Sequence, residues 1–353
     1  MSTESIEASF LSIFALISFF IFLIVSKYSH KIKGGVLLDK DFLKPQAFHD
    51  VPITRSGGIG VLVSLSVFFF IYYLLYSKIL FDYILISYSM FLIGFLDDLK
   101  INIKPLHRLL IMITLLFIFI LILPIKIFNI DIPFLLFFLE NRFFSPLFVL
   151  LCFLFVINGA NLIDGFNGLL TINLIIINLI LTVVNIDNEN FQFSFVLITQ
   201  IIVLITFLLF NFPSAKIFLG DGGAYLLGSL VSLNVITTNN LNPDISSFFF
   251  CSLLFYLFFE VFFSFFRKLL QKKSPIYPDN KHLHMLTFFK ISQIYGKHKG
   301  NFLNSIILNA GYLILILPGL YFLKNPIISR YWFFTLLIIY IFVYFRLYRL
   351  TKN

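Results

Sequence analysis

The sequence has few charged residues for its length. Only 12% of its 353 residues are Asp, Glu, Lys or Arg, whereas a soluble domain carries about 25%. Such a chain cannot cover a water-facing surface. Hydrophobic residues instead make up 59% of the sequence, and Phe alone contributes 50 residues. Because apolar runs near the ~20-residue length of a membrane span recur from end to end, the composition predicts an integral membrane protein.

Cysteine is also scarce, and a signal peptide is not indicated. Cys152 and Cys251 each lie inside an apolar run, and neither has the Cys or His spacing of a metal site or a disulfide framework. We therefore interpret both as small buried residues. The N-terminus carries Glu4 and Glu7 but no basic residues, so we expect a first helix that remains in the membrane.

The apolar runs predict an all-α, polytopic helix bundle that forms a single domain over residues 1–353. We expect about eleven spans, with ten as the main alternative because the fifth is short and residues 125–142 are compatible with a re-entrant piece. The expected spans are 8–26, 57–77, 80–96, 107–125, 143–158, 168–186, 192–211, 222–239, 246–267, 303–323 and 329–346.

Lys and Arg residues set the expected orientation. If the N-terminus lies outside, 21 of the 26 Lys and Arg residues fall in inside loops or the C-terminal tail. The outside then has only Lys78, Lys126, Arg142, Lys324 and Arg330. Such a bias indicates cytoplasmic loops and a cytoplasmic C-terminus. It also explains the net charge of +9 without a nucleic-acid partner.

Five short polar segments interrupt the apolar background, and this topology places all of them on the cytoplasmic side. They fall in the loops at about 27–56, 97–108, 158–168, 211–222 and 267–302. In the first segment, HDVPITRSGGIG, Arg55 precedes Gly57 and Gly58 where the second span begins. Backbone N–H groups at a helix start favour anions. The alternative is an ordinary loop-to-helix junction.

The second segment, GFLDDLKINIKPLHR, carries an aspartate pair. Asp97 and Asp98 lie at the end of the third span, and Lys104 follows. Adjacent carboxylates at a membrane boundary are costly unless they are paired or bind a metal, and their oxygens suit Mg²⁺. One of them also suits a general base, because a neighbouring negative charge raises a carboxyl pKa. A solvated acidic pair at a helix end is the alternative.

The third segment, NGANLIDGFNGLL, repeats polar residues at intervals of three. Asn158, Asn161, Asp164 and Asn167 fall near one face if the stretch is helical. Amides can recognise base and sugar edges, and Asp164 suits a metal or a ribose. An interhelical polar ladder is the alternative, but four polar residues beside three glycines favour a functional site.

The fourth segment, KIFLGDGGAYLLG, presents Asp221 on a glycine turn at the mouth of the eighth span. There the Asp221 carboxylate suits a cation, although Asp221 could equally serve as the N-cap of the helix. Phe218 is able to stack on a base. The fifth segment, SPIYPDNKHLHM, carries Asp279, Lys281, His282 and His284. Its imidazoles suit a diphosphate, and a solvated loop is the alternative.

Glu260 lies within the ninth expected span. An intramembrane carboxylate indicates a functional site, or a partner elsewhere in the bundle. Arg267 shares its helix face but lies about two turns away, so we expect Glu260 to have a different partner.

In this order, from about residue 45 to 285, the five segments resemble the polyprenyl-phosphate N-acetylhexosamine-1-phosphate transferase family, glycosyltransferase family 4. That family includes initiators of O-antigen, common antigen and teichoic acid synthesis and is related to lipid I synthase. SPIYPDNKHLH resembles the histidine motif of the polysaccharide initiators. The sequence departs from the family pattern at Met112, Asn167 and Met285, which bears on sugar specificity.

The resemblance implies transfer of N-acetylhexosamine 1-phosphate from a UDP-sugar, for example UDP-GlcNAc, to undecaprenyl phosphate, with release of UMP. It implies a multi-pass enzyme of the bacterial inner membrane whose site faces the cytoplasm and begins a surface polysaccharide such as O-antigen. The implied cofactor is Mg²⁺, with Mn²⁺ as the alternative. A homodimer is compatible with the sequence, although no motif indicates one.

The resemblance also implies roles for individual residues. Asp221 and Asp98 would hold the metal ion. The implied catalytic residues are Asp97, Asp98, Asp164 and Asp221. The implied substrate-binding residues are Arg55, Lys104, Asn158, Asn161, Asn167, Phe218, His282 and His284. Two alternatives remain: a lipid I synthase acting on UDP-MurNAc-pentapeptide, and a transporter or flippase for a phosphorylated lipid.

Overall fold

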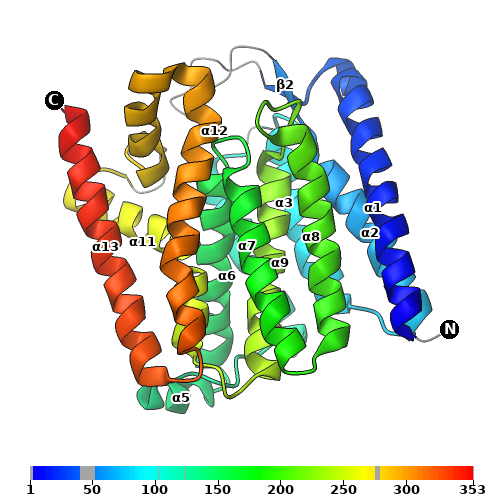
Figure 1. The fold of residues 1–353 in the computed structure, drawn as a ribbon, viewed down its shortest axis with the longest axis vertical. Coiled ribbons are helices and arrows are strands. Elements are labelled where there is room, and N and C mark those ends of the chain that lie inside the picture. Colours follow the sequence, from blue (N-terminus) through cyan, green and yellow to red (C-terminus); the bar gives the residue numbers. More distant parts are fainter. Residues whose placement is uncertain (1–2, 40–51, 102, 124, 275–278, 353) are drawn as a thin grey trace.

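The apolar runs fold into helices that stand side by side as a bundle (Figure 1). The computed structural model describes residues 3–39, 52–101, 103–123, 125–274 and 279–352. The helices are α1 (Thr3–Tyr28), the 3-10 helix η1 (Ser29–Gly34), α2 (Gly57–Tyr76), α3 (Phe81–Asp98), α4 (Pro105–Ile122), α5 (Pro133–Leu139), α6 (Phe144–Ile163), α7 (Leu169–Asp187), α8 (Phe191–Asn211), α9 (Gly220–Leu241), α10 (Ser247–Leu253), α11 (Phe255–Leu270), α12 (Leu283–Tyr321) and α13 (Pro326–Lys352). The expected all-α membrane bundle is confirmed.

Helix α9 forms the centre of the bundle. It packs against α2, α3, α6 and α7 and is buried along almost its whole length. Its sequence is rich in Gly, Ser and Asn, and small residues let neighbouring helices approach closely inside a membrane protein. The outer helices α1, α4 and α13 expose large apolar side chains instead. These exposed side chains suit a lipid surrounding.

Within the described residues, eight helices are long and apolar enough to cross a membrane, or nine if the bent pair α10–α11 counts as one span. Neither α3, which contains three Asp residues, nor the polar α9 is among the eight. Both nevertheless belong to the bundle, where they pack against each other. The count of eleven spans therefore stays a prediction, as does the orientation. The start of α1 and the end of α13 lie at opposite ends of the bundle.

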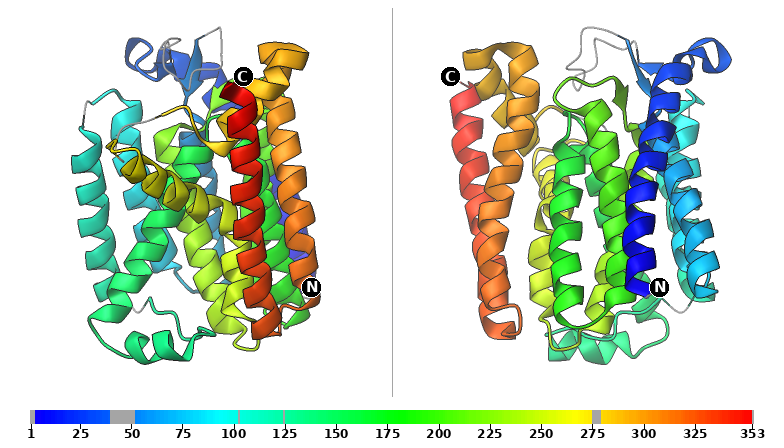
Figure 2. Two further views of the ribbon diagram at one scale, coloured as in Figure 1. Left: turned by 90° about the vertical axis from the view of Figure 1, so that its left-hand side faces the viewer. Right: turned by 45° about the vertical axis from the view of Figure 1, so that its right-hand side comes forward.

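The ninth expected span, 246–267, is not one straight helix. It is divided at Leu254 into α10 and α11, which are bent by 74° from each other. Glu260, Ser264 and Arg267 share one face of α11 and are buried, whereas its opposite face exposes Phe262 and Phe266. Helix α11 lies obliquely across the bundle, with this polar face turned inward (Figure 2).

Two other regions differ in detail from the expected spans. The tenth, 303–323, is only the later part of α12, which is interrupted by non-helical backbone at Gly296. Region 125–142 contains the short helix α5, at the end of the bundle where α1 begins. Cys152 is partly exposed and Cys251 is exposed, so the interpretation of both as buried residues is wrong.

A small sheet that the sequence did not predict lies at one end of the bundle. Its strands are β1 (Leu38–Asp39), β2 (Ile53–Arg55) and β3 (Ile217–Phe218), with β2 in the middle. Strand β2 runs antiparallel to β1 and parallel to β3, and Arg55 is in register with Phe218. The sheet thus joins the loop before α2 to the loop before α9. Residue 49, the histidine of the first motif, lies outside the described residues.

Candidate active site

The five polar segments meet at one end of the bundle. The start of α2, the end of α3, the end of α6, the start of α9 and the start of α12 all lie toward the upper end in Figure 1. There the side chains of Asp97, Asp98, Asp221, Arg55 and Arg108 form one connected set, which we call the aspartate–arginine cluster.

Asp98 holds the start of α9 in place. Its two side-chain oxygens accept hydrogen bonds from the backbone N–H groups of Asp221, at 3.0 Å, and Gly222, at 2.9 Å. A buried carboxylate is favourable here because the N-terminus of a helix carries a partial positive charge. Asp98 therefore orients Asp221 and uses one lone pair of each oxygen in doing so.

Gly220 is required for this arrangement. Its φ is +80°, and a Cβ built on it would lie 2.6 Å from the Asp98 Oδ2 atom. A side chain at this position would be strained by the backbone conformation and would also push Asp98 away. The glycine that precedes Asp221 thus permits the close approach of α3 and α9.

Arg108 joins the other two aspartates. Its Nη1 atom lies 3.0 Å from the Asp97 Oδ2 atom and 2.8 Å from the Asp221 Oδ2 atom. The guanidinium group also lies over the ring of Tyr225, at 5.6 Å from the centroid. In the sequence, Arg108 is marked only as one of the basic residues of the expected inside loops. A cation in the first turn of an otherwise apolar helix, shortly after an aspartate pair, is the signal that points to it.

Arg55 enters the cluster from strand β2. Its Nε and Nη2 atoms donate to the Asp39 Oδ2 atom at 3.0 and 2.8 Å, and its Nη1 atom lies 3.6 Å from Asp98 and 3.8 Å from Asp221. Burial opposes its charge, but Asp221, Asp39 and Asp98 raise the pKa of Arg55 above its usual value. No local motif marks Asp39, because only the pairing of β1 with β2 brings it to Arg55.

Carboxyl groups outnumber guanidinium groups among the described residues that form these ion pairs. Four carboxyl groups, of Asp39, Asp97, Asp98 and Asp221, face two guanidinium groups. Among the described residues no three His, Cys, Asp or Glu side chains form a complete metal site. Mg²⁺ needs only one or two carboxylates because substrate phosphate and water fill the rest of its shell. The donors present therefore fit a Mg²⁺ ion that binds together with a phosphate.

Asp164 directly follows α6 and is half-buried. Its burial, and next the negative charge of Asp221, raise the pKa of Asp164 well above the usual carboxyl range, whereas Arg55 opposes the shift. These electrostatic neighbours place Asp164 toward the aspartate–arginine cluster. All four aspartates that the sequence singled out are thus brought to one region.

The asparagines of the third segment have different surroundings. Asn158 donates to the Leu154 carbonyl of its own helix at 2.7 Å, and Asn161 is half-buried one turn before Asp164. Asn167 lies in the turn after α6, where its side chain donates to the Pro213 carbonyl at 2.9 Å. The backbone N–H of Asn167 donates to the Asn301 side chain, also at 2.9 Å. Asn167 therefore ties this turn to its neighbours.

Phe218 and Lys104 lie at the same end of the bundle. Phe218 is half-buried in β3, in register with Arg55. Lys104 is exposed at the N-cap position of α4, one turn before Arg108. Each thus lies next to an arginine of the aspartate–arginine cluster, Phe218 through the sheet and Lys104 along the chain.

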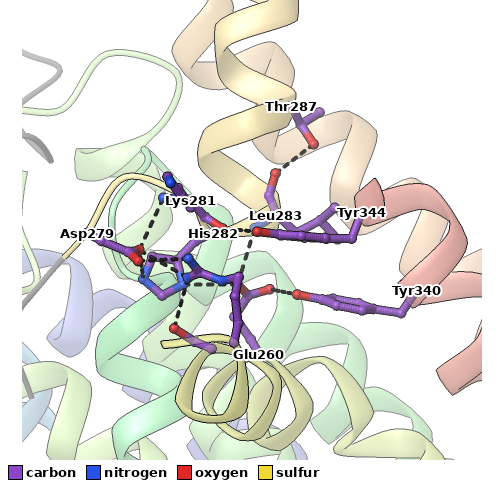
Figure 3. Close-up of polar contacts among 10 residues, drawn as sticks. Glu260, Asp279, Lys281, His282, Leu283, Thr287, Tyr340 and Tyr344 are labelled. Atoms are coloured by element: carbon purple, nitrogen blue, oxygen red, sulfur yellow. Dashed lines mark hydrogen bonds and ion pairs between the residues drawn. The ribbon is translucent and has the colours of Figure 1, made fainter. Parts of the chain in front are cut away.

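The two histidines are buried away from the surface. His282 is 2% exposed and His284 0%. The Nδ1 atom of His282 lies 3.0 Å from the Glu260 carboxylate and its Nε2 atom 3.4 Å from Asp279 (Figure 3). Glu260 thus has the separate partner that the sequence analysis expected. The structure places the His282 imidazole between two protein carboxylates, whereas the resemblance implied that the histidines contact the substrate.

Comparison with known proteins identifies the family. The model of glycosyl transferase family 4 matches residues 80–239, which include all four aspartates. Undecaprenyl-phosphate alpha-N-acetylglucosaminyl 1-phosphate transferase of Thermotoga maritima is 27% identical over 79% of this chain and 81% of its own length. Phospho-N-acetylmuramoyl-pentapeptide-transferase of Dictyoglomus turgidum is 30% identical over 63% of this chain and 73% of its own length.

The chain belongs to glycosyl transferase family 4. The resemblance inferred from the five polar segments is therefore confirmed, and with it a membrane-embedded transferase rather than a transporter. A further relative is the phospho-N-acetylmuramoyl-pentapeptide-transferase of Petrotoga mobilis, which is 32% identical over 57% of this chain and 67% of its own length. Arg55, the histidines and α13 lie outside the matched family region.

Proposed function

We propose that this protein transfers N-acetylhexosamine 1-phosphate from a UDP-sugar to undecaprenyl phosphate, giving undecaprenyl-diphospho-sugar and UMP. The observation that carries the proposal is the aspartate–arginine cluster at the helix ends of a membrane bundle. A lipid phosphate in the bilayer and a nucleotide in water can meet only at such a boundary. The names of the relatives from Thermotoga maritima and Dictyoglomus turgidum support the same chemistry.

The reaction joins two anions. An oxygen of the lipid phosphate would attack the β-phosphorus of the UDP-sugar, and the bond from that phosphorus to the bridging oxygen would break, so that UMP leaves with the bond's electron pair. Positioning and charge stabilisation are the main contributions that a protein makes to phosphoryl transfer. One guanidinium group can donate two parallel hydrogen bonds to phosphate oxygens. Arg55 and Arg108 would therefore bind the diphosphate, and Lys104 would contact it from the exposed edge of the site.

The aspartates would divide the remaining work. Asp97 is the most exposed of the three in the cluster, at 34% of its side chain, and would accept the proton of the lipid phosphate or orient that phosphate. Asp221 would hold Mg²⁺, and Asp98 would fix Asp221 and complete the site. When bound, the ion would offset the negative charge that develops on the leaving UMP. Asp164, Asn161 and Phe218 would position the nucleotide and the sugar.

We further propose that the site faces the cytoplasm of a bacterial inner membrane, where the basic loops would lie. The product would begin a surface polysaccharide such as O-antigen. UDP-GlcNAc is the first candidate donor because the Thermotoga maritima relative aligns over most of both chains. UDP-MurNAc-pentapeptide is the second candidate, because the relatives from Dictyoglomus turgidum and Petrotoga mobilis carry that activity in their names.

A donor panel tests the proposal. Purified protein would be incubated with undecaprenyl phosphate, Mg²⁺ and one donor at a time: UDP-GlcNAc, UDP-GalNAc or UDP-MurNAc-pentapeptide. The masses of the lipid products would be measured by mass spectrometry. We expect a lipid diphosphate carrying a single N-acetylhexosamine. A product only with UDP-MurNAc-pentapeptide would assign the second function, and no lipid product with any donor would refute the transferase.

A further inference from the structure

Helix α13 presents a row of tyrosines to the histidine segment, residues 279–284. Tyr340, Tyr344 and Tyr348 are spaced by four residues and therefore share one helix face. Their rings stack nearly parallel, with centroids 6.3 Å apart for the first pair and 6.1 Å for the second. We call this row the tyrosine stripe.

The first member of the stripe bonds a buried carboxylate. The Tyr340 hydroxyl donates to the Glu260 Oε2 atom at 2.5 Å, and Glu260 is only 1% exposed. The Oε1 atom of Glu260 accepts from the backbone N–H of Leu283 at 3.2 Å and contacts His282 at 3.0 Å (Figure 3). Glu260 thus connects α13 to the segment through both of its oxygens.

The other tyrosines contact the segment directly. The Tyr344 hydroxyl donates to the Lys281 carbonyl at 3.0 Å, and the Lys281 Nζ atom lies 5.6 Å from the centroid of the Tyr348 ring. On the opposite side of the segment, the guanidinium of Arg267 donates to both oxygens of Asp279 at 2.8 and 3.1 Å. The segment is therefore held between α11 and α13.

These contacts continue to the turn that carries Asp164. The ring of His284 stacks on that of His282 with an interplanar angle of 2° and a centroid distance of 5.4 Å. It meets the ring of Phe166 edge to face at 5.9 Å. Among the described residues neither ring nitrogen of His284 has a hydrogen-bond partner. His284 therefore acts here by packing, and its packing partner lies two residues after Asp164.

The hydroxyl groups exclude a purely apolar role for this face of α13. A helix that only anchors the chain needs no polar atom in its buried contact, since Phe would fill the same space. A hydroxyl buried in a membrane protein is costly unless it is hydrogen-bonded. Tyr344 bonds the segment directly, and Tyr340 bonds Glu260, which in turn contacts the segment. These hydrogen bonds are directional, so they fix the orientation of the segment, which apolar packing alone would not do.

We propose that Tyr340 and Tyr344 of α13 are positioning residues, which hold His282 and His284 against the Asp164 turn through Glu260 and Lys281. The proposal rests on the proposed transferase function for its effect on turnover. On this account the histidines support the site from behind and do not bind the diphosphate. The last helix then contributes to the active site although it lies outside the matched family region.

The test compares Tyr340→Phe with Tyr331→Phe in the full-length protein. Tyr331 also belongs to α13, but it is 67% exposed and lies off the stripe. Hydrogen exchange of a peptide covering residues 279–287 would be measured first, because it reports the position of the segment independently of any activity. The turnover rate would then be measured as UMP release at varied UDP-sugar concentration, which separates kcat from KM.

We expect Tyr340→Phe to increase exchange in this peptide and to lower kcat about tenfold, the effect of one lost hydrogen bond to a charged group. Tyr331→Phe should change neither. The loss should appear in kcat and not in KM for the UDP-sugar, because on this account the segment supports the Asp164 turn without contacting the donor.

Unchanged exchange in Tyr340→Phe would refute the docking of the segment by α13. Increased exchange with an unchanged kcat would refute its role in turnover, and an equal loss of active protein with unchanged kcat per folded molecule would reduce Tyr340 to a purely structural residue. If the wild-type protein releases no UMP, the proposed function fails, whereas the exchange data still decide whether α13 positions the segment.

Discussion

Two polar clusters lie at the same end of the bundle, and they differ in how open they are. In the aspartate–arginine cluster, the side chains of Asp97, Arg55 and Asp221 are 34%, 27% and 20% exposed. Around the histidine segment, the side chains of Glu260 and His282 are 1% and 2% exposed. Both clusters are rich in ionisable groups. Most side chains of the first are the more accessible to a substrate, although Asp98 within it is 2% exposed and Asp279 of the histidine segment is 21% exposed.

The charges are also arranged differently. The open cluster has more carboxylates than cations, and its arginines are shared among several carboxylates. Near the histidines each carboxylate has its own hydrogen-bond donors. For Asp279, partial burial raises the pKa, but the hydrogen bonds from Arg267 outweigh this effect and lower it to about 2. An incomplete charge balance suits binding of a cation and phosphates, whereas a complete one suits a support. A charged motif in the sequence does not by itself tell these two roles apart.

The largest effect is expected from Asp221→Asn, which removes one charge from the open cluster. The amide keeps the shape but binds a cation poorly, so we expect kcat to fall roughly a thousandfold, as when a group that stabilises the transition state is lost. Asp244→Asn, an exposed residue of the loop after α9, is the control and should leave UMP release unchanged. Full turnover of Asp221→Asn at saturating Mg²⁺ would remove Asp221 from the metal site.

A smaller effect is expected from Arg108→Lys. An ammonium group is a compact point charge and cannot contact Asp97, Asp221 and a phosphate in the fork geometry of a guanidinium. We expect kcat/KM to fall about a hundredfold, which corresponds to loss of a charge-assisted hydrogen bond or two. Initial rates at varied UDP-sugar concentration check this. A variant with wild-type kcat and KM would show that Arg108 only balances charge.

Gly220→Ala tests the geometry between α3 and α9. The new Cβ would meet Asp98 and would require a left-handed backbone, so we expect about 1–3 kcal/mol of destabilisation together with lower activity. The matched change is Gly311→Ala in α12, where a Cβ meets no atom within 4 Å. Thermal unfolding in detergent compares the two, and equal melting temperatures would contradict a tight Asp98–Asp221 connection.

The smallest effect is expected from Asp164→Asn, which should stabilise the protein where Gly220→Ala destabilises it. Because the pKa of Asp164 is raised in the folded protein, the wild-type protein loses stability as pH rises from the ordinary carboxyl pKa to the raised pKa of the folded state. The neutral amide avoids this loss, so Tm at pH 8 should rise by about 1–3 °C while UMP release falls. The gain should vanish below about pH 4, where the carboxyl is protonated in both states. A lower Tm at pH 8 would contradict the assignment.

Much of the architecture could be predicted because it is encoded locally. Apolar runs of membrane length place the helices, and the topology of the spans brings Asp97, Asp98, Asp164 and Asp221 to one end. The small sheet could not be predicted, because β2 and β3 are short and far apart in the chain. Asp39 and its contact with Arg55 depend on that sheet. Burial of His282 depends on Glu260 and Tyr340, which belong to two other helices.

The measurement that tests the central claim most directly is the identity of the nucleotide product. Purified protein would be given UDP-GlcNAc, undecaprenyl phosphate and Mg²⁺, and the released nucleotide would be separated by anion-exchange chromatography. Transfer of a phosphosugar predicts UMP in equal amount to a lipid diphosphate product. Release of UDP would mean that the sugar moves without its phosphate, and it would contradict the account, as would the absence of any nucleotide product with every UDP-N-acetylhexosamine.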